Sequence, residues 1–273
     1  MTDRYAVIGN PIAQSKSPLI HGQFAATHGQ DMVYEAIEGP LEGFADAVRA
    51  FIAAGGRGMN VTAPFKLQAY EMADTLSERA RQAGAVNTLK FEGGRIAADN
   101  FDGIGLVNDL QRNLGMALSG CRVLMLGAGG AARGALRPLL EQGPAELVIA
   151  NRHPEKAEAL ARPYAASHGV RGISYAEIGR QRFDLVVNAT SASLRGELPP
   201  VPATAFSPEG LAYELAYGKG LTPFLRLAQN AGVSHLADGV GMLIEQAAEG
   251  FAWWRGVRPE TGPVIRRMTV PLV

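Results

Sequence analysis

The sequence has little cysteine, no excess of either charge and no long apolar run. Its one cysteine, Cys121, excludes an internal disulfide bond and a zinc site built from cysteines. Its 26 basic and 26 acidic side chains give a formal net charge of zero, which argues against a general attraction to nucleic acid. No stretch is apolar for long enough to span a bilayer, and residues 1–4 do not resemble a signal peptide. We therefore expect a soluble cytoplasmic protein.

The sequence also contains no internal repeat, no low-complexity tract and no metal-binding motif. Its histidines show no ligand spacing, and we interpret all five as structural: His21, His28, His153, His168 and His235. Hydrophobic residues make up 47% of the chain and charged residues 19%, which is an ordinary globular balance. With 273 residues, the chain is long enough for one large domain or two modest ones.

The most informative stretch begins at residue 122. An apolar run at 122–126 leads into the glycine-rich turn 127–132, and a helical pattern then leads to a second apolar run at 146–150. This order of strand, turn, helix and strand is typical of one half of a dinucleotide-binding fold. The helix N-terminus would offer unpaired N–H groups and a positive dipole end to phosphates. The stretch therefore predicts a Rossmann nucleotide site.

Individual residues of the turn agree with this interpretation. Gly127 allows the tight turn, and Gly129 lets the backbone approach a pyrophosphate. Ala132 takes the place of the third glycine and keeps helix and strand close. Pro138 lies inside the predicted helix and should kink it or end it early.

The residues after the second apolar run indicate which dinucleotide binds. A site for NAD places an acidic side chain about 20 residues beyond the glycines, where it accepts hydrogen bonds from the ribose. Here that place holds Asn151, Arg152 and His153, with Lys156 following. Arg152 and Lys156 would neutralise a 2′-phosphate that an acid would repel, so we predict NADP. The alternative is a solvated basic helix start.

Residues 1–102 alternate predicted strands and helices but carry no phosphate-binding loop, so we expect a separate α/β substrate domain. The strands are expected at 5–8, 33–37, 58–61, 85–89 and 95–100. The helices are expected at 17–27 with Ser17 as N-cap, and at 41–52, 66–73, 77–84 and 102–113.

Residues 103–237 form the predicted nucleotide domain. Beyond its opening stretch we expect helices at 154–166 and 222–231 and strands at 185–188 and 211–213. Residues 238–273 contain a strongly helical segment at 239–254. We expect this last segment to pack back on the substrate domain, with the ligand cleft between the two lobes.

Two candidate catalytic residues follow the ends of predicted strands. A cofactor and a substrate domain together suggest hydride transfer, in which the protein must move one proton at a carbonyl or alcohol oxygen. Lys66 follows the run 58–61, and Asp102 follows the strand 95–100. A lysine beside an aspartate would be held in place and kept charged, ready to donate to an oxygen that gains negative charge. The alternatives are a surface charge for either residue and a helix N-cap for Asp102.

Taken together, short motifs along nearly the whole chain resemble those of the shikimate dehydrogenase family, the NADP-dependent enzymes of aromatic amino-acid biosynthesis. These motifs lie at 9–12, 15–18, 60–66, 84–88, 99–103, 127–131, 151–152, 188–191, 239–243 and 246–247. Each motif is modest alone, but the ordered set is highly specific. The resemblance implies an α/β substrate domain built from both chain ends and a Rossmann domain for NADP.

The resemblance also implies roles for individual residues. Lys66 and Asp102 would form the catalytic pair. The residues implied to bind substrate are Ser15, Ser17 and Tyr217 at its carboxylate, and Thr62, Asn87 and Gln246 at its hydroxyls. Those implied to bind cofactor are Gly127, Ala128, Gly129, Gly130 and Ala131 at the pyrophosphate, Asn151, Arg152 and Lys156 at the adenosine phosphate, Thr190, Leu215, Gly239 and Met242 on the nicotinamide side, and more weakly Glu78. Short hydroxyl and amide groups suit a polyol, because the wrong ligand leaves them unpaired.

Four places depart from the family pattern. Phe101 stands where the family usually has threonine, so the polar setting of Asp102 is expected to differ. Glu214 stands where an aspartate is usual, and residues 194–195 stand where glycine is more usual. His153 replaces a threonine, which affects the expected detail of 2′-phosphate binding.

The resemblance implies reversible reduction of 3-dehydroshikimate to shikimate by NADPH, by a monomer or homodimer that binds neither nucleic acid nor membrane. One alternative is a dual-specificity enzyme that uses quinate and NAD, against which Arg152 argues. A second is a catalytically silent sensor of NADP or a shikimate-like ligand, against which Lys66 and Asp102 argue. A third, a structural or partner-binding protein, leaves the glycine-rich turn unexplained.

Overall fold

The computed structural model describes residues 2–272, and the chain divides into two compact units. The first unit comprises Met1–Gly105 and Leu243–Arg266, and the second comprises Leu106–Met242 and Arg267–Val273. Each unit combines helices with a β-sheet, which confirms the predicted α/β class. The residues from Arg267 onward group with the second unit, whereas the sequence analysis assigned all of 238–273 to the substrate domain.

The first unit contains a six-stranded sheet in the order β2-β1-β3-β5-β6-β4. Its strands are β1 (Asp3–Gly9), β2 (Met32–Glu38), β3 (Gly56–Val61), β4 (Thr75–Leu76), β5 (Thr88–Glu92) and β6 (Arg95–Asp99). Strand β1 is parallel to β2 and β3, whereas β5 is antiparallel to β3 and to β6. The carboxyl ends of β1, β3 and β6 therefore lie at the same edge as the amino end of β5. The pair β5–β6 is the predicted hairpin, although β5 begins later than expected.

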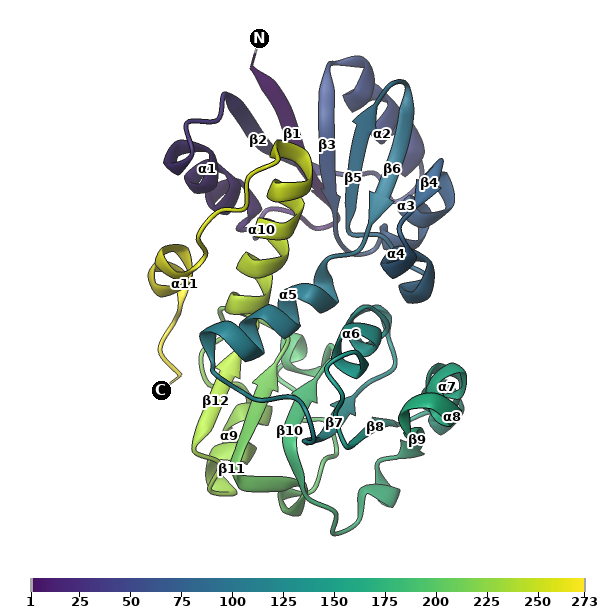
Figure 1. The fold of residues 1–273 in the computed structure, drawn as a ribbon, viewed down its shortest axis with the longest axis vertical. Coiled ribbons are helices and arrows are strands. Elements are labelled where there is room, and N and C mark those ends of the chain that lie inside the picture. Colours follow the sequence, from purple (N-terminus) through teal and green to yellow (C-terminus); the bar gives the residue numbers. More distant parts are fainter. Residues whose placement is uncertain (1, 273) are drawn as a thin grey trace. The chain divides into compact units, whose positions relative to one another are not determined.

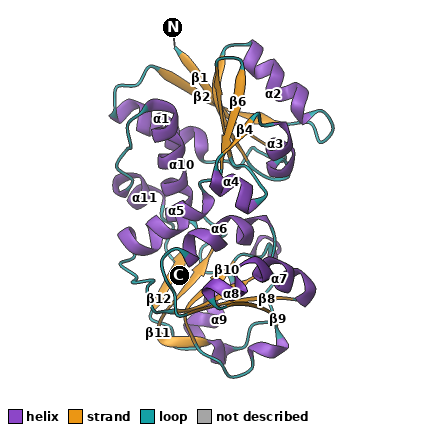
Figure 2. Ribbon diagram, turned by 45° about the vertical axis from the view of Figure 1, so that its right-hand side comes forward, coloured by secondary structure: helices purple, strands orange, loops and turns teal. Residues whose placement is uncertain are grey.

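Helices cover both faces of this sheet (Figures 1 and 2). The helices that lie wholly or partly in this unit are α1 (Ser17–Thr27), α2 (Phe44–Ala53), α3 (Lys66–Met72), α4 (Glu78–Ala83), α5 (Asp102–Asn108), α10 (Val240–Arg255) and α11 (Gly262–Met268), of which α5, α10 and α11 each run past a unit boundary. Because successive strand residues point to opposite faces, Ala6 and Ile8 of β1 pack in one cluster with Val48 of α2, while Tyr5 contacts Trp254 of α10.

Side-chain capping differs between α1 and α4. The N-cap of α1 is Lys16, without a side-chain cap bond, so the prediction of Ser17 as N-cap is wrong by one residue. Ser17 is instead the first helical residue, and its own N–H donates to Ser15 Oγ at 3.3 Å. Ser77 caps α4 by accepting a hydrogen bond from the Ala80 N–H.

The second unit contains a wholly parallel sheet in the order β12-β11-β10-β7-β8-β9. Its strands are β7 (Arg122–Leu126), β8 (Glu146–Asn151), β9 (Val170–Ser174), β10 (Phe183–Asn188), β11 (Phe206–Glu214) and β12 (His235–Asp238). Counted within the unit, this is the order 3-2-1-4-5-6 of the dinucleotide-binding fold, which confirms the Rossmann prediction. Strands β9 and β12 were not predicted, and β11 is longer than expected.

The helices of the second unit are α6 (Gly130–Leu140), α7 (Pro154–Ala161), α8 (Ala165–His168) and α9 (Pro223–Asn230). Helix α6 continues through Pro138 and ends two residues later. The helix predicted at 154–166 is divided by a 3₁₀ turn at Arg162–Tyr164, where Pro163 lacks the N–H that a continuous helix needs. Among the helices of residues 2–272, none has both the length and the apolar character needed to cross a membrane.

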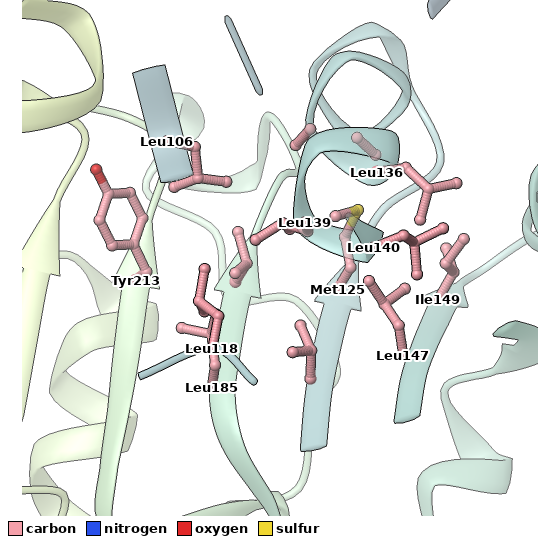
Figure 3. Packing of buried hydrophobic residues seen from close by; sticks show 14 of the residues in the cluster. Leu106, Leu118, Met125, Leu136, Leu139, Leu140, Leu147, Ile149, Leu185 and Tyr213 are labelled. Carbon is pink, nitrogen blue, oxygen red and sulfur yellow. The ribbon is translucent and has the colours of Figure 1, made fainter. Parts of the chain in front are cut away.

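The buried cluster in Figure 3 holds α6 against the second sheet. Met125 and Leu185 come from the central strands, and Leu136 and Leu140 come from the helix. Ala132 is fully buried in the same cluster, as expected for a small residue that lets helix and strand approach closely. This packing places the start of α6 directly after the carboxyl end of β7.

Candidate active site

Four chain segments of the first unit bring polar side chains to one edge of its sheet. Ser15 follows β1, Thr62 and Lys66 follow β3, and Asp102 follows β6. Asn87 directly precedes β5, whose amino end lies at that edge. Ligands of open α/β sheets bind at the carboxyl ends of strands, so this edge is the expected place for a substrate.

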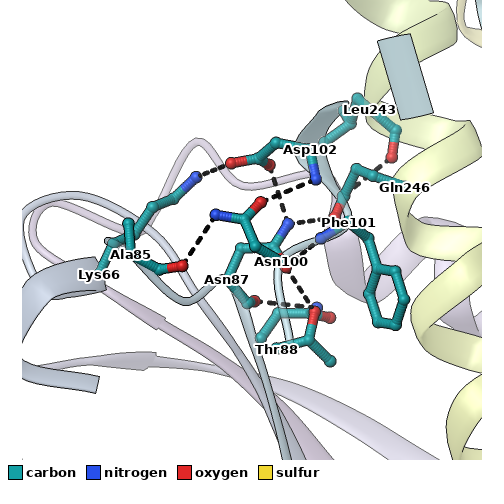
Figure 4. A network of polar contacts seen from close by, with 10 residues as sticks. Lys66, Ala85, Asn87, Thr88, Asn100, Phe101, Asp102, Leu243 and Gln246 are labelled. Atoms are coloured by element: carbon teal, nitrogen blue, oxygen red, sulfur yellow. Dashed lines mark hydrogen bonds and ion pairs between the residues drawn. The ribbon is translucent and has the colours of Figure 1, made fainter. Parts of the chain in front are cut away.

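Lys66 and Asp102 form an ion pair at this edge, with 2.5 Å between Nζ and Oδ2 (Figure 4). The Lys66 side chain is 27% exposed and that of Asp102 is 12% exposed, so the pair is largely withdrawn from water but still reachable. An ammonium group has three N–H donors, and Asp102 uses one of them. The remaining donors can serve a ligand oxygen. The carboxylate bonds Lys66 and Asn87, so the N-cap alternative does not describe Asp102.

Asn87 is the centre of the network that holds this pair, and it is only 3% exposed. Its Nδ2 donates to Asp102 Oδ1 at 2.8 Å and to Gln246 Oε1 at 3.2 Å. Its Oδ1 accepts from the Phe101 N–H at 3.0 Å and from the Thr88 hydroxyl at 2.9 Å. Because both ends of the amide are engaged, the amide cannot turn over without breaking several bonds. Asn87 therefore fixes the direction of the Asp102 carboxylate.

Three residues to which the sequence analysis gave no role complete the network: Asn60, Thr88 and Asn100. Asn60 Nδ2 donates to Thr88 Oγ1 at 3.0 Å, and Asn100 Oδ1 accepts from the Asp102 N–H at 3.1 Å. All three side chains are buried. A signal was available, because each residue lies in a family-like motif and asparagine is unusual in or beside a buried strand.

Phe101, which stands where the family usually has threonine, is buried beside the Lys66–Asp102 pair and supplies no side-chain hydrogen bond. Its ring centroid lies 5.9 Å from that of Trp253, and the Arg79 guanidinium lies 5.3 Å from its ring centre. Arg79 is also paired with Asp99 at 2.6 Å. The polar setting of Asp102 is therefore provided by its other neighbours, and Phe101 contributes a backbone N–H and a packed ring.

The loops after β1 and β3 approach each other closely at the same edge. The Thr62 N–H donates to Ile8 O at 3.0 Å, and a Cβ added to Gly9 would overlap the Thr62 methyl group. Gly9 is thus required by close approach of the two segments. Ser15 and Ser17, joined by the bond described above, continue the first of these loops into α1.

In the second unit, the glycine-rich turn follows β7. Gly127 has a φ of +104°, and a Cβ there would lie 3.1 Å from Ala189 O, so no other residue fits without strain. Gly129 is the N-cap of α6, and an added Cβ at Gly129 or Gly130 would meet no atom within 4 Å. The turn is completed by Ala128, which is buried, and Ala131, which is half-buried. The helix N-terminus thus presents an open backbone surface.

The end of β8 carries the predicted phosphate-binding residues. Asn151 Oδ1 accepts from the Arg152 N–H at 3.0 Å, and Asn151 Nδ2 donates to His153 O at 3.3 Å. Arg152 and Lys156 are exposed, and within residues 2–272 neither side chain forms an ion pair. His153 lies with its Nδ1 3.6 Å from a Glu155 oxygen. The two cations are therefore available to an anion.

A buried carboxylate ties together the loops after β10 and β11. Glu214 is fully buried and accepts from Asn188 Nδ2 at 2.9 Å, from the Ser193 hydroxyl and from the Thr222 hydroxyl at 3.2 Å. Asn188 Oδ1 in turn accepts from the Thr190 hydroxyl at 2.7 Å. Burial raises the pKa of the Glu214 carboxyl, and the hydrogen bonds oppose that shift. Glu214 stands where the family usually has aspartate, so an acidic side chain is kept at this position, and it helps to position Thr190.

The start of α10 is held by the end of β11. A Cβ added to Gly239 would overlap the Leu215 carbonyl, so only glycine allows this approach. The Met242 N–H donates to the Tyr213 hydroxyl at 3.3 Å, and that hydroxyl donates to Asp109 Oδ2 at 2.6 Å. Burial raises the pKa of Tyr213 well above its ordinary value, so this phenol stays a donor.

Tyr217 and Glu78 do not lie in the units that hold the other residues predicted to bind the same ligands. Tyr217 belongs to the second unit, where it is half-buried and burial raises its pKa. Glu78 belongs to the first unit, where it is the first residue of α4 and pairs with Arg81 at 3.5 Å. The departure at Arg195 forms an exposed pair with Glu197 at 2.8 Å. The roles implied for Tyr217 and Glu78 stay predictions.

The second unit has the features that a dinucleotide with a 2′-phosphate needs. An 11-residue helix begins at glycines without side chains, and two cations stand at the next strand end. No acidic side chain occupies the ribose position after β8, where Asn151 stands. Within residues 2–272, no group of three His, Cys, Asp or Glu side chains is arranged to hold a metal ion.

Comparison with known proteins agrees with both units. The model of the shikimate dehydrogenase substrate binding domain matches residues 7–89, that of shikimate / quinate 5-dehydrogenase matches 109–195, and that of the shikimate 5′-dehydrogenase C-terminal domain matches 239–269. A relative from Nitrosospira multiformis named shikimate dehydrogenase (NADP(+)) is 60% identical over 97% of this chain and 96% of its own length.

Solved structures are similar along the whole chain. An Ael1 enzyme from Pseudomonas putida is 60% identical with a TM-score of 0.95, covering 100% of each chain. A shikimate 5-dehydrogenase from Thermus thermophilus, in complex with NADP(H) and shikimate, is 34% identical with a TM-score of 0.86, covering 98% of this chain and 100% of its own. These identities and coverages, together with the three matched domain models, show that the chain belongs to the shikimate dehydrogenase family.

Proposed function

We propose that the protein catalyses the reversible, NADPH-dependent reduction of 3-dehydroshikimate to shikimate. The observation that carries the proposal is the Lys66–Asp102 pair, held by Asn87 at the strand edge of the unit that matches the substrate-binding model. Family membership and the names of the relatives, which specify NADP(+), support the same reaction. The glycine-rich turn and the exposed cations after β8 support NADP as the cofactor.

The proton at the reacting oxygen is the task of the first unit. The bound cofactor supplies or accepts the hydride at the ring carbon. In the reducing direction, Lys66 Nζ donates a hydrogen bond to the carbonyl oxygen, stabilises its growing negative charge and transfers a proton to it. Asp102 holds the ammonium in position until the transfer. Water then returns a proton to the Lys66 amine.

The other polar groups of the first unit suit the remaining parts of a hydroxylated ring acid. We assign Ser15 and Ser17 to the carboxylate, and Thr62, Asn87 and Gln246 to the hydroxyls. Asn87 and Gln246 are joined by a 3.2 Å hydrogen bond, and a ligand hydroxyl would replace this bond, because both Nδ2 hydrogens of Asn87 are already donated. Tyr217 is assigned to the carboxylate on the resemblance alone.

The cofactor assignments follow the second unit. The N–H groups of residues 127–131 take the pyrophosphate, and Asn151, Arg152 and Lys156 take the adenosine phosphate. Thr190, Leu215, Gly239 and Met242 line the nicotinamide side, with Glu78 as a weaker contributor. We further propose that the enzyme works in the cytoplasm as a monomer or homodimer.

The test is formation of NADPH absorbance by purified protein with shikimate and NADP⁺. Quinate and NAD⁺ are assayed beside them in all four combinations. Turnover with shikimate and NADP⁺ at least ten times more efficient than any other combination is expected. Comparable efficiency with quinate or NAD⁺ would favour the dual-specificity alternative, and ligand binding without any NADPH formation would favour a silent sensor.

A further inference from the structure

A tyrosine outside the proposed catalytic machinery begins a chain of hydrogen bonds that leads into it. Tyr34 lies in the edge strand β2, opposite Tyr5 of β1. The residue is partly exposed as a whole, but its hydroxyl is buried, and this burial raises the pKa of Tyr34 well above its ordinary value. The hydroxyl therefore remains protonated at neutral pH and acts as a donor.

The ring of Tyr34 is fixed by aromatic contacts. It stacks on the His21 ring with centroids 4.2 Å apart and planes 4° from parallel. His21 is fully buried, and burial lowers its pKa to about 3, with the nearby Asn60 side chain opposing the shift. Neither nitrogen of His21 has a hydrogen-bond partner among the described residues. His21 is therefore a neutral, flat packing surface that keeps the Tyr34 ring in one plane.

Helix α10 packs against this ring pair, and the Trp254 ring centroid lies 6.4 Å from that of Tyr34. The His21 ring centroid lies 6.2 Å from that of Phe251 and 5.5 Å from that of Trp254. Trp254 is itself anchored, because its Nε1 donates to Leu89 O at 3.0 Å. The phenol of Tyr34 is thus held by packing, and its hydroxyl cannot swing away from its polar partners.

From this hydroxyl, four hydrogen bonds run in one direction to the catalytic pair. Tyr34 donates to Asn60 Oδ1 at 2.6 Å, and Asn60 Nδ2 donates to Thr88 Oγ1 at 3.0 Å. The Thr88 hydroxyl donates to Asn87 Oδ1 at 2.9 Å, and Asn87 Nδ2 donates to Asp102 Oδ1 at 2.8 Å. Each donor meets an acceptor of the next group, so the Tyr34 hydroxyl reinforces the amide orientations that two backbone groups also favour, the Asn87 carbonyl for Asn60 and the Phe101 N–H for Asn87.

The Tyr34 hydroxyl also has a polar neighbour at the start of α1. Ser17 opposes the rise in the pKa of Tyr34 that burial causes. Ser17 is buried and is assigned to the substrate carboxylate. The hydrogen bond from Tyr34 to Asn60, at 2.6 Å, leads to the amides beside Asp102.

We propose that Tyr34 is a positioning residue of the substrate site, whose hydroxyl supports the orientation of the Lys66–Asp102 pair through Asn60, Thr88 and Asn87. The inference rests on the proposed function, because it needs the Lys66–Asp102 pair to act on the substrate. Tyr34 does not touch the reacting atoms in this proposal. Its effect is to keep the amide and hydroxyl partners in the one arrangement that suits the ligand.

The test is the variant Tyr34→Phe, with Tyr5→Phe as its matched control. Both changes remove one hydroxyl from the same aromatic cluster, but the Tyr5 hydroxyl reaches Arg255 at 3.4 Å and not the chain to Asp102. We expect Tyr34→Phe to lower kcat/KM for shikimate by about 5- to 50-fold, because it leaves a buried acceptor without its donor. A rise in KM for shikimate should accompany a fall in kcat, while KM for NADP⁺ stays within twofold. Tyr5→Phe should stay within twofold on every parameter.

A second comparison separates positioning from general stability. Thr88→Val removes the hydroxyl in the middle of the chain, so its effect on kcat/KM should not add to that of Tyr34→Phe in the double variant. Additive effects, equal losses in Tyr5→Phe and Tyr34→Phe, or a Tyr34→Phe enzyme within twofold of wild type would each overturn the inference. Wild-type turnover of shikimate with NADP⁺ is measured alongside; its absence would overturn the proposed function as well, whereas its presence isolates the result for Tyr34.

Discussion

The two units place polar groups at the carboxyl ends of their strands in different ways. In the first unit, side chains bond one another across loops, so that Lys66, Asp102 and Asn87 form one connected set. In the second, the strand ends present glycine and backbone N–H groups. The buried carboxylate of Glu214 accepts hydrogen bonds that keep the loops in place. The first arrangement suits recognition of separate hydroxyl groups and movement of one proton. The second suits phosphates, which many N–H donors can bind at once.

This difference has a consequence for substitutions. A side-chain site fails when one functional group is removed, although the backbone around it is unchanged. A backbone site fails when a side chain is added or when the chain is forced out of its conformation. Substitutions in the first unit should therefore change chemistry at constant cofactor affinity, and those in the second should change cofactor affinity or stability.

The largest expected effect is that of Lys66→Ala. It removes the proposed proton donor, so kcat at saturating shikimate should fall by about 10²- to 10⁴-fold, the usual contribution of a general acid or base. Affinity for NADP⁺, measured by titration calorimetry, should stay within about threefold. Near-normal turnover would remove Lys66 from the mechanism. Lys90→Ala, a change of the same type at a lysine of β5 that pairs with Glu92, serves as control.

The next largest effect is expected for Arg152→Ala in the second unit. Loss of a charge-assisted hydrogen bond to the 2′-phosphate should raise KM for NADP⁺ by about 10- to 100-fold and leave KM for shikimate unchanged. Any rate measured with NAD⁺ should not fall, because NAD⁺ has no 2′-phosphate. Equal losses with both cofactors in steady-state assays would contradict the assignment. Arg162→Ala offers a control at an exposed arginine of the same unit.

Gly127→Ala tests the backbone part of the comparison. The substitution forces alanine into a φ of +104° and places a Cβ 3.1 Å from Ala189 O, so it should destabilise the protein by about 1–3 kcal/mol. Thermal unfolding and KM for NADP⁺ measure the two consequences. Gly29→Ala also has a positive φ, at +58°, but meets no atom within 4 Å, so it should cost less and leave KM unchanged. Equal behaviour of the two variants would show that the close approach is unimportant.

The smallest effect is expected in the pH dependence of stability at Glu214. Its folded pKa is raised by burial, so its contribution to stability is present below the ordinary value of 4.5 and is lost as pH rises through the folded pKa. Glu214→Gln does not titrate. The melting temperature of wild type minus that of the variant should therefore decrease as pH rises from about 4.5 toward neutrality. A difference that grows over this range would contradict the raised pKa.

Local patterns predicted much of the second unit and its site. The run 122–126, the turn at Gly127 and the run 146–150 specify a strand, a turn and a helix start within about 30 residues, and such short-range order is visible in sequence. Strands β9 and β12 were missed because they are short and lie on the two edges of the sheet, where periodicity is weak. Ser17 was predicted to be the N-cap of α1, because serine followed by proline is typical of a helix start, but it is the first helical residue.

The site of the first unit was harder to predict from the sequence, because it depends on contacts between segments that are distant along the chain. Lys66 and Asp102 were selected as candidates at strand ends, but their 2.5 Å contact depends on the direction of β3 and β6 in one sheet. Asn60 and Thr88 attracted no role, although they support Asn87. A hydrogen bond between side chains on different strands leaves no trace in local composition.

By itself, the sequence determined the kind of fold, the family and the cofactor preference, because glycine spacing, strand-end charges and ordered motifs act over short stretches of chain. The tertiary structure alone decided which polar groups meet: that Asn87 faces Asp102, that Glu214 is buried behind Thr190, and that the Tyr34 hydroxyl leads to the catalytic pair. The physical reason is that hydrogen bonds need donor and acceptor within about 3 Å, and only the packed sheets bring these segments that close.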